Sequence, residues 1–422
     1  MTEELKARIA QINAGTAPAG YKKTKVGIVP EEWETKALGQ VLTRVSNAVD
    51  VEPETMYTQI GIRSHGNGLF YKEPVSGEEL GNKSVFWIEP DCFILNIVFA
   101  WEQAIGKTTE QEVGMIASHR FPMYKPNDLD IDYLVFYLLT KRGTVLLDLA
   151  SPGGAGRNRT LGQEHFLKSK VPLPPLPEQQ KIAEILTAQD AVIALMQKQI
   201  ELLQKQKKAF LQKMFPQKGC NVPEIRFAGF TDAWEQRKFG EQYQKITEKN
   251  DLSFGADKII SVANMYFKSD VKQSDDDYMR TYNIMRLGDI AFEGNKSKHF
   301  AHGRFVENTI GDGIVSHVFD VFRPIADYDL FFWKYLINNE GVMGRIMTRC
   351  TKASTMMTNL VADDFLAETI FVPSIQEQQK IGAFLDKLDS LITLHQRKLE
   401  SEQKKKKALM QLLLTGKVRC IK

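Results

Sequence analysis

Four polar loops in this sequence gather side chains that can recognise nucleic-acid bases. They read IGIRSHGNGLFYK at 60–72, SPGGAGRNRT at 151–160, FEGNKSKHFAHGR at 292–304 and TRCTKASTMMT at 348–358. Arginine and lysine bond to guanine edges, asparagine and glutamine bond to adenine edges, and glycine lets the backbone approach a phosphate. The candidate DNA-binding residues are Arg63, His65, Asn67, Arg157, Asn158, Arg159, Asn295, Lys296, Lys298, His299, Arg304, Lys352, Ser354 and Thr355. Because any one such residue is as often merely solvated, the prediction rests on the set of loops.

A repeated Ser-His dipeptide suggests a different chemistry, nucleophilic catalysis. It occurs as Ser118-His119 and as Ser316-His317. Adjacent residues on a strand point to opposite faces, and no third residue that would orient the histidine is evident. The SPGGAG stretch lacks the G-x-x-x-x-G-K-[ST] pattern of a phosphate-binding loop. We therefore predict no catalytic residue in this chain and favour a structural role for the dipeptide.

Neither a metal site nor a disulfide framework is expected. The cysteines, at positions 92, 220, 350 and 420, are scattered, with no C-x-x-C pair and no neighbouring histidine cluster. The acidic run Asp275–Asp277 lacks the interleaved ligands of a calcium loop. The charged N-terminal stretch is unlike a signal sequence, and the longest apolar run, CFILNIVFAW from Cys92, is too short to span a bilayer. A reducing, cytoplasmic location without a membrane is the expectation.

Two long helices are the elements that must position these loops. At a constant offset of 199 residues, the stretch Glu178–Gln212 matches the stretch that begins at Glu377 at 17 of 35 positions. Prolines precede both copies, as they do at helix starts, and apolar residues then recur with the four-three spacing of a coiled-coil seam. The helix-packing and partner-contacting residues predicted from this seam are Ile182, Leu186, Ile193, Met196, Ile200, Leu203, Ile381, Leu385, Leu388, Ile392 and Leu399.

A second apolar line runs beside this seam. Its members are Ile185, Val192, Leu195 and Leu202 in the first helix and Phe384, Leu391 and Leu394 in the second. This line makes the apolar stripe wider than a seam between two helices needs. We therefore expect another surface to cover it.

The segments between the helices are also duplicated. Trp33 and Trp234 open similar stretches, and Phe166 and Phe365 match at the offset of the helices. Short apolar runs such as Phe93–Phe99 and Ile314–Phe322, broken by Gly, Asn and Asp, predict strands, and a few helical stretches accompany them. The sequence thus predicts an α+β fold in which two mixed modules are joined by two long antiparallel coiled-coil helices, as a pseudo-twofold tandem duplication.

Charge is unevenly spread along the chain. The formal net charge is +3, and 43% of the residues are hydrophobic, which is enough for two or three cores. Both helical stretches are basic, and the rest of the chain is net acidic. The chain is therefore no general polycation, and contacts with nucleic acid require local patches or help from a partner.

The whole chain resembles the specificity subunit of type I restriction-modification systems. The resemblance rests on two near-identical helices that begin EQQKI, two differing modules with tryptophan entries, the passage VPEIRFAGFTDAWEQRK at 222–238 and the ending LLLTGKVR. It implies an N-terminal extension at 1–20, a target recognition domain at 21–171, a helical spacer at 172–218, a second recognition domain at 219–371 and a second spacer at 372–422. Each recognition domain would read one half of a bipartite site in double-stranded DNA, and the helices would set the spacing.

The resemblance also implies partners and cofactors outside this chain. Two modification subunits, which bind S-adenosylmethionine and methylate adenine, would dock on the helices. Restriction subunits with motor and nuclease activity, which use ATP and Mg²⁺, would complete the complex. This chain itself would be a non-catalytic DNA-recognition subunit that binds no cofactor and no metal.

Two alternatives come from other classes of protein. A stand-alone DNA-modifying enzyme is one, but the sequence has no N-P-P-[YF] adenine-methylation motif, no glycine-rich cofactor fingerprint and no convincing cluster of nuclease carboxylates. A coiled-coil scaffold that binds no DNA is the other. Such a scaffold would not need module loops that are long, basic and punctuated by glycine.

Overall fold

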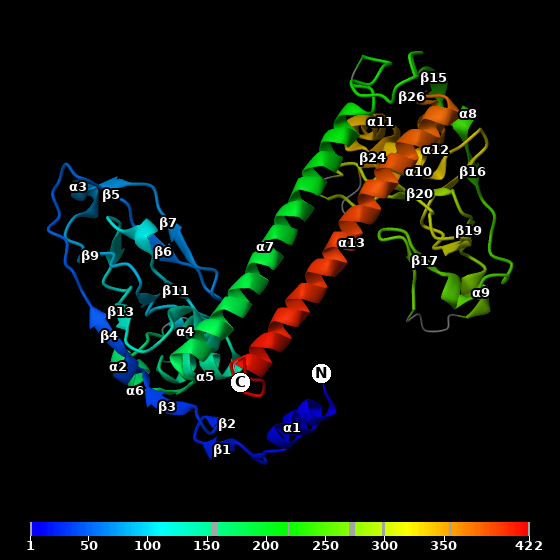
Figure 1. Ribbon diagram of the computed structural model, residues 1–422. Coiled ribbons are helices and arrows are strands. Elements are labelled where there is room, and N and C mark those ends of the chain that lie inside the picture. The colour runs from blue at the N-terminus through cyan, green and yellow to red at the C-terminus, as the bar shows by residue number, and fades with distance from the viewer. Residues whose placement is uncertain are drawn as a thin grey trace. The chain divides into compact units, whose positions relative to one another are not determined.

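The computed structural model (Figure 1) describes residues 2–153, 159–217, 219–269, 275–297, 300–353 and 357–420. The chain divides into two compact units. Unit 1 comprises Met1–Met196 with Lys398–Lys422, and unit 2 comprises Gln197–Arg397. Each unit contains one module of strands and short helices and one part of each long helix. The predicted fold class, a duplicated α+β module with long helices, is confirmed.

The module of unit 1 is built on a four-stranded antiparallel sheet with the order β11-β10-β13-β4. The other strands of this module form two-stranded antiparallel sheets. The strands are β1 Tyr21–Thr24, β2 Gly27–Pro30, β3 Glu34–Ala37, β4 Leu42–Val45, β5 Met56–Tyr57, β6 Ile60–Ile62, β7 Leu69–Tyr71, β8 Val75–Ser76, β9 Val85–Trp87, β10 Phe93–Leu95, β11 Ile105–Lys107, β12 Ile116–Ser118, β13 Met123–Pro126 and β14 Lys170–Leu173. The short helices are α1 Glu3–Asn13, α2 Leu38–Val41, α3 Gly77–Leu80, η1 Ala100–Glu102, η2 Glu110–Glu112, α4 Ile131–Leu138, α5 Lys141–Leu149 and α6 Gln163–Lys168.

The module of unit 2 repeats this arrangement. Its four-stranded sheet has the order β21-β20-β23-β16. These strands correspond, in this order, to β11, β10, β13 and β4 of unit 1. The strands are β15 Glu235–Lys238, β16 Tyr243–Ile246, β17 Ile260–Ser261, β18 Tyr266–Phe267, β19 Asn283–Met285, β20 Ile290–Glu293, β21 Arg304–Glu307, β22 Gly313–Val315, β23 Val321–Pro324, β24 Thr351–Ala353, β25 Thr358–Leu360 and β26 Thr369–Val372. The short helices are α8 Phe239–Gln242, η3 Ala256–Lys258, α9 Asp276–Met279, α10 Leu330–Ile337, α11 Glu340–Cys350 and α12 Ala362–Ala367.

Two predicted strands are shorter than the sequence suggested. The run Phe93–Phe99 forms a strand only to Leu95, because the side chain of Asn96 then accepts a hydrogen bond from the backbone N–H of Val98 at 3.0 Å and the chain turns toward η1. The run Ile314–Phe322 is split between β22 and β23 by a turn that contains Ser316 and His317. A local polar side chain that bonds its own backbone competes with the sheet, and hydrophobicity alone does not reveal it.

The two long helices are α7, Leu176–Lys213, and α13, Ile375–Leu413. Polar residues at their seam pair with one another rather than interrupting the contact. Within unit 1 the amide of Gln189 donates to the carboxylate of Glu402 at 2.7 Å, and Lys406 pairs with Asp190 at 2.5 Å. Within unit 2, Lys207 of α7 pairs with Asp389 of α13 at 2.5 Å. Within unit 1 the start of α7 shares a core with the end of α13, and Gln189, farther along α7, meets Glu402, which lies earlier in α13, so the two helices are antiparallel.

Both ends of each long helix pack into a module core. In unit 1 the first turns of α7, with Ile182 and Leu186, share a core with Leu413 and Leu414 at the end of α13. In unit 2 the corresponding core contains Ile381 and Leu385 from α13 and Met214 and Phe215 after α7. Of the seam residues farther along, Ile200 and Ile392 are buried, whereas Ile193, Met196, Leu203, Leu388 and Leu399 are partly exposed.

The second apolar line is covered at two of its positions by the chain itself. Ile185 packs against the core of unit 1, and Phe384 meets Phe210 edge to face with ring centroids 4.9 Å apart. The remaining members are exposed: 41% for Val192, 58% for Leu195, 56% for Leu202, 37% for Leu391 and 48% for Leu394. We therefore expect another surface to cover only these five residues.

Unit 2 contains a buried acid without a partner. Glu307 is 2% exposed, and neither of its carboxylate oxygens has a hydrogen-bond partner among the described residues. The hydroxyl of Tyr243 and the indole N–H of Trp333, both buried in the core of unit 2, also lack a hydrogen-bond partner in the described part of the chain. Burial raises the pKa of the Glu307 carboxyl well above its usual range; the charge of Lys334 opposes this rise, and that of Asp329 adds to it. We infer that the folded protein holds this carboxyl in its neutral form.

This neutral acid predicts a pH-dependent stability. As the pH rises above about 4.3, the glutamate ionises in the unfolded chain but must keep its proton in the folded one. The free energy of unfolding of unit 2 should therefore fall by up to about 1.4 kcal/mol per pH unit until the pH reaches the folded pKa. In urea unfolding at pH 6, 7 and 8, Glu307→Gln should flatten this decline. The exposed Glu235→Gln should leave the slope unchanged, and equal slopes for the two variants would contradict a neutral Glu307.

Candidate nucleic-acid interface

The first polar loop connects β6 and β7 of unit 1 and is held by its backbone. The N–H groups of His65 and Gly66 donate to the carbonyl oxygens of Glu102 and Gln103 at 2.8 and 3.0 Å. His65 itself has a positive φ of 60°. These contacts fix the loop on η1 and leave the side chains of His65 and Asn67 exposed. A loop whose backbone is fixed while its side chains face solvent suits base recognition.

Arg63 is turned back onto its own hairpin. Its guanidinium donates to the carbonyl oxygen of Leu69 at 2.6 Å and lies over the ring of Phe70 at 5.1 Å from the centroid. The amide of Asn67 donates to the carbonyl oxygen of Ser64 at 2.8 Å, so its oxygen is the atom left to accept from a ligand. Of the three candidates in this loop, His65 has the side chain least engaged by the protein.

The second polar loop of unit 1 approaches the same 3₁₀ helix. Arg159 pairs with Asp148 of α5 at 2.7 Å and lies over the ring of Trp101 in η1 at 5.6 Å. The other two candidates of this loop, Arg157 and Asn158, lie outside the described residues. The helix η1 therefore brings together two loops that are nearly a hundred residues apart in the sequence. The sequence offered no signal for Trp101 and Asp148, because neither stands in a polar loop.

The two polar loops of unit 2 are also joined. The N–H of Thr358 donates to the carbonyl oxygen of Gly294 at 2.8 Å, and Asn295 forms a bridge with Met357. A Cβ at Gly294 would stand 2.2 Å from the carbonyl oxygen of Thr358, so only glycine permits this approach. The side chains of Asn295, Lys296 and Lys352 are exposed at this junction. The candidates Lys298, His299, Ser354 and Thr355 lie outside the described residues.

Arg304 has a different role from its neighbours. Its guanidinium donates to Glu293, its cross-strand partner, at 2.8 Å and to the carbonyl oxygen of Ala263 at 2.7 Å. Both contacts are internal to the module. We therefore expect Arg304 to support the loop rather than to reach a base.

The repeated Glu-Gln at the start of each long helix anchors that helix to its module. Gln179 donates to the carbonyl oxygen of Pro174 at 2.9 Å and accepts from the N–H of Asp130 at 2.9 Å. Its counterpart Gln378 makes the same pair of contacts with Pro373 and Asp329. These contacts place each long helix directly against the module that carries the polar loops.

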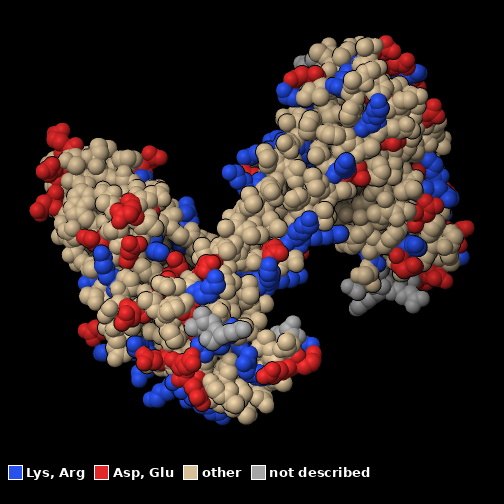
Figure 2. Space-filling view, in the orientation of Figure 1, with Lys and Arg blue, Asp and Glu red and all other residues tan. Residues whose placement is uncertain are grey.

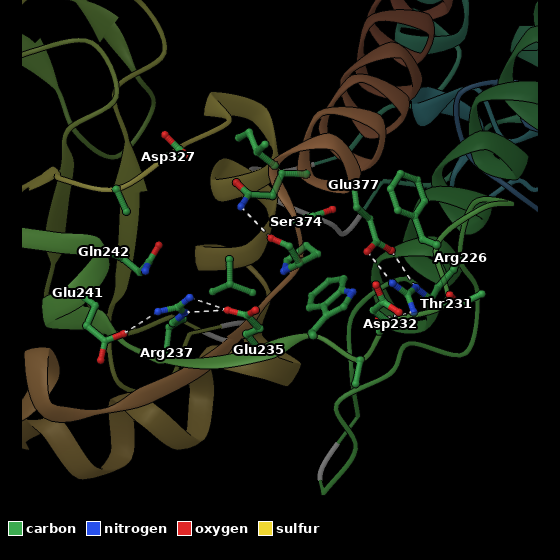
Figure 3. A pocket seen from close by; sticks show the side chains of 18 of the residues that line it. Arg226, Thr231, Asp232, Glu235, Arg237, Glu241, Gln242, Asp327, Ser374 and Glu377 are labelled. Carbon is green, nitrogen blue, oxygen red and sulfur yellow. Dashed lines mark hydrogen bonds and ion pairs between the residues drawn. The ribbon is translucent and has the colours of Figure 1, made fainter.

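The preceding glutamate is a buried ion-pair partner in both units. Glu178, which is fully buried, accepts from the indole N–H of Trp33 at 3.0 Å and from Arg419 at 2.7 Å. Glu377 receives two parallel hydrogen bonds from Arg226 at 2.9 and 2.7 Å (Figure 3). Arg419 and Arg226 come from the segments that follow the opposite helix in each case.

The cleft beside Arg226 and Glu377 has a volume of about 560 Å³. Its charged side chains are largely engaged with each other, since Arg237 also pairs with Glu235 at 2.5 Å and with Glu241 at 3.8 Å (Figure 3). Because these charges pair with one another, we interpret the cleft as a contact between the helix and the module and not as a ligand site.

The structure gives little support to chemistry at the other polar groups. Burial raises the pKa of the Cys92 thiol to about 11 and that of Cys350 to about 12, so both thiols stay protonated near neutral pH.

Within the described part of the chain, no group of three or more His, Cys, Asp or Glu residues is placed to hold a metal ion. No helix in that part is both long and apolar enough to cross a membrane.

Comparison with known proteins identifies the class of this fold. The family described as type I restriction modification DNA specificity domain matches twice, at residues 30–205 and 234–402. The chain belongs to this family. The two matches coincide with the two repeats of module and helix, as a duplicated specificity protein requires.

Particular relatives cover nearly the whole chain. The type I restriction enzyme MjaVIII specificity subunit of Methanocaldococcus jannaschii is 25% identical, over 93% of this chain and 94% of its own length. The putative MjaX specificity subunit of the same organism is 27% identical, over 94% and 96%. A solved type I restriction-modification S subunit from M. genitalium shares the fold with a TM-score of 0.54 at 11% identity, covering 90% of this chain and 96% of that one. A chain from a solved type I R-M system has the same TM-score of 0.54 at 16% identity.

Proposed function

We propose that this chain is the DNA specificity subunit of a type I restriction-modification complex in which each module reads one half of a bipartite site. The observation that carries this is the family match to both repeats, each of which brings two polar loops together, at η1 in unit 1 and by a direct bridge in unit 2. Two reading surfaces on one chain suit a target with two separate parts. The long helices would set the distance between those parts, since 38 residues of α7 extend about 57 Å at 1.5 Å per residue.

The same proposal assigns the partners and the chemistry. The chain itself would not catalyse; two modification subunits would bind S-adenosylmethionine and methylate adenine, and restriction subunits would use ATP and Mg²⁺. The exposed apolar residues Val192, Leu195, Leu202, Leu391 and Leu394, which we name the outer apolar line, would receive the modification subunits. Figure 2 shows Lys and Arg side chains gathered along the two long helices, where they would help to hold a complex that contains DNA.

The experiment that tests this function is sequencing of methylated DNA from cells that express the chain with an adenine-methylating partner. We expect a bipartite motif with methyladenine in each half, and we expect it only when this chain is present. The control is the partner alone. The same methylation pattern from the partner alone, or methylation by this chain alone, would overturn the proposal.

A loop variant adds a sharper expectation to the same experiment. His65→Ala with Asn67→Ala should relax the sequence requirement in one half of the motif and leave the other half intact, because both residues belong to unit 1. Each lost base contact costs roughly 1–3 kcal/mol of discrimination, or about 5-fold to 150-fold. Lys296→Ala, on unit 2, is the matched change and should relax only the other half. Relaxation of both halves by either variant would contradict the assignment of one half to each module.

A further inference from the structure

Unit 1 contains two adjoining clefts, each of about 520 Å³, that share Tyr137, Lys141 and Arg142. One lies between the start of α5 and the end of α13, and the other runs along α5 toward the turn after β1. Six cations line the two clefts, namely Lys25, Lys141, Arg142, Lys170, Lys407 and Lys417. Among the described lining residues there is no carboxylate, and within the described part of the chain none of the six forms an ion pair.

Two of these cations lie close together, with no counter-ion among the residues that the structure describes. Arg142 is wedged against Gly27, where a Cβ would stand 2.6 Å from its Nη2. Lys417 donates to the side-chain oxygen of Asn13 at 2.6 Å. Burial and then the charge of Arg142 lower the pKa of the Lys417 ammonium. An uncompensated pair of like charges costs free energy that a bound anion would recover.

The backbone at the same place also favours an anion. Lys141 and Arg142 are the first two residues of α5, whose N-cap Thr140 accepts from the N–H of Gly143 at 3.2 Å. The N–H groups of the first helical residues have no partner within the helix, and the helix dipole adds positive potential there.

Unit 2 lacks the two cations that unit 1 has at the start of α5. At the offset of 199 residues, Glu340 and Gly341 stand where unit 1 has Lys141 and Arg142. The N-cap Asn339 donates directly to the carbonyl oxygen of Leu211 at 2.8 Å. The fold of the module therefore does not require cations at positions 141 and 142, and a role specific to unit 1 explains these two better.

The clefts border the first recognition loop. Leu139, which lines the cleft at the end of α13, lies against Gly66, between His65 and Asn67. Gln103, beneath that loop, donates to Thr144 of α5 at 2.7 Å. A nucleic acid bound at this loop would therefore lie close enough to contact α5.

We propose that these clefts bind the phosphodiester backbone of DNA beside the bases that unit 1 reads. This inference rests on the proposed function and extends it to a backbone site. The cations would meet phosphates, and the apolar floor of Tyr137, Leu139 and Met410 would accept deoxyribose. The other partner with this chemistry is an acidic protein segment, which the experiment separates.

The test is the salt dependence of DNA binding by the complex of this chain with a modification subunit. Affinity for a target duplex and for an unrelated duplex is measured by fluorescence anisotropy between 50 and 200 mM salt (about a fourfold range). Lys141→Gln with Arg142→Gln should reduce the slope of log affinity against log salt by about 2, for both duplexes alike. The matched control is Lys168→Gln with Lys181→Gln, two exposed lysines already paired with Glu164 and Glu184, which should leave the slope unchanged.

The outcomes separate the inference from the proposed function. An unchanged slope in the first variant would overturn the inference, whatever the wild-type complex prefers to bind. If the wild-type complex prefers no sequence, the proposed function is overturned. The salt dependence measured on the unrelated duplex would still test the backbone site. Loss of assembly with the modification subunit, with an unchanged slope in the complex that remains, would identify an acidic protein segment as the ligand. Lys417→Gln, which lies outside α5, should lower the slope by about 1 and guards against a folding defect in that helix.

Discussion

Replacing Arg419 with methionine is expected to lower the free energy of unfolding of unit 1 by about 3–5 kcal/mol. The reason is that Glu178 has no exposed side-chain surface and relies on two donors, Arg419 and the indole of Trp33. Methionine has a length similar to that of the arginine stem but carries no charge. The substitution would therefore leave a buried carboxylate with only one neutral donor.

The measurement is urea or thermal unfolding of the variant against wild type. The control is Lys168→Met, which removes an exposed pair with Glu164 and should cost less than about 1 kcal/mol. In the double variant Glu178→Gln with Arg419→Met, the buried charge is gone, so part of the lost stability should return. An effect of Arg419→Met no larger than that of the control would mean that residues 413–420 do not hold this module to its helix.

Replacing Leu195 and Leu202 with glutamate is expected to weaken association with the modification subunit by at least about 100-fold. Both residues belong to the outer apolar line and are more than half exposed, at 58% and 56%. A leucine side chain that becomes buried contributes roughly 1.5–3 kcal/mol, and a carboxylate in its place would have to be desolvated. Because the residues face solvent in the free chain, the melting temperature should change little.

Isothermal titration of the purified modification subunit into the variant measures this effect. The matched control is Thr187→Glu with Ala194→Glu, which places two carboxylates seven residues apart on another exposed face of α7. We expect the control to bind like wild type. Equal binding by the leucine variant would show that the modification subunits dock elsewhere, and a loss of thermal stability would show that the outer apolar line is part of the fold.

Much of the architecture follows from local patterns in the sequence. The start of α7 at Leu176 follows from the proline run that precedes Glu178, and its length follows from a continuous apolar repeat with no glycine and no proline after Pro177. The duplication follows from identity at a constant offset, and the matching sheet orders of the two modules confirm it. These features are readable because each depends on residues within a few turns of one another, or on direct comparison of two copies.

The candidate site was predictable only in outline. The sequence placed Arg63 and Arg304 among residues that could read bases. In the structure, the guanidinium groups of both donate hydrogen bonds within their own modules. An arginine in a polar loop has the same composition signal whether it meets DNA or a neighbouring carboxylate. The partner decides its role, and for Arg304 that partner, Glu293, lies on the adjacent strand.

By itself, then, the sequence determined the duplicated α+β fold, the two long helices and the family to which the chain belongs. Only the tertiary structure decided which groups meet: Arg419 with Glu178, 241 residues apart, and the six cations that line the clefts of unit 1, drawn from the N-terminal hairpin, α5, β14 and the end of α13. The physical reason is that helix and strand formation depends on local periodicity, whereas burial and charge pairing depend on long-range contacts that close only when the core forms.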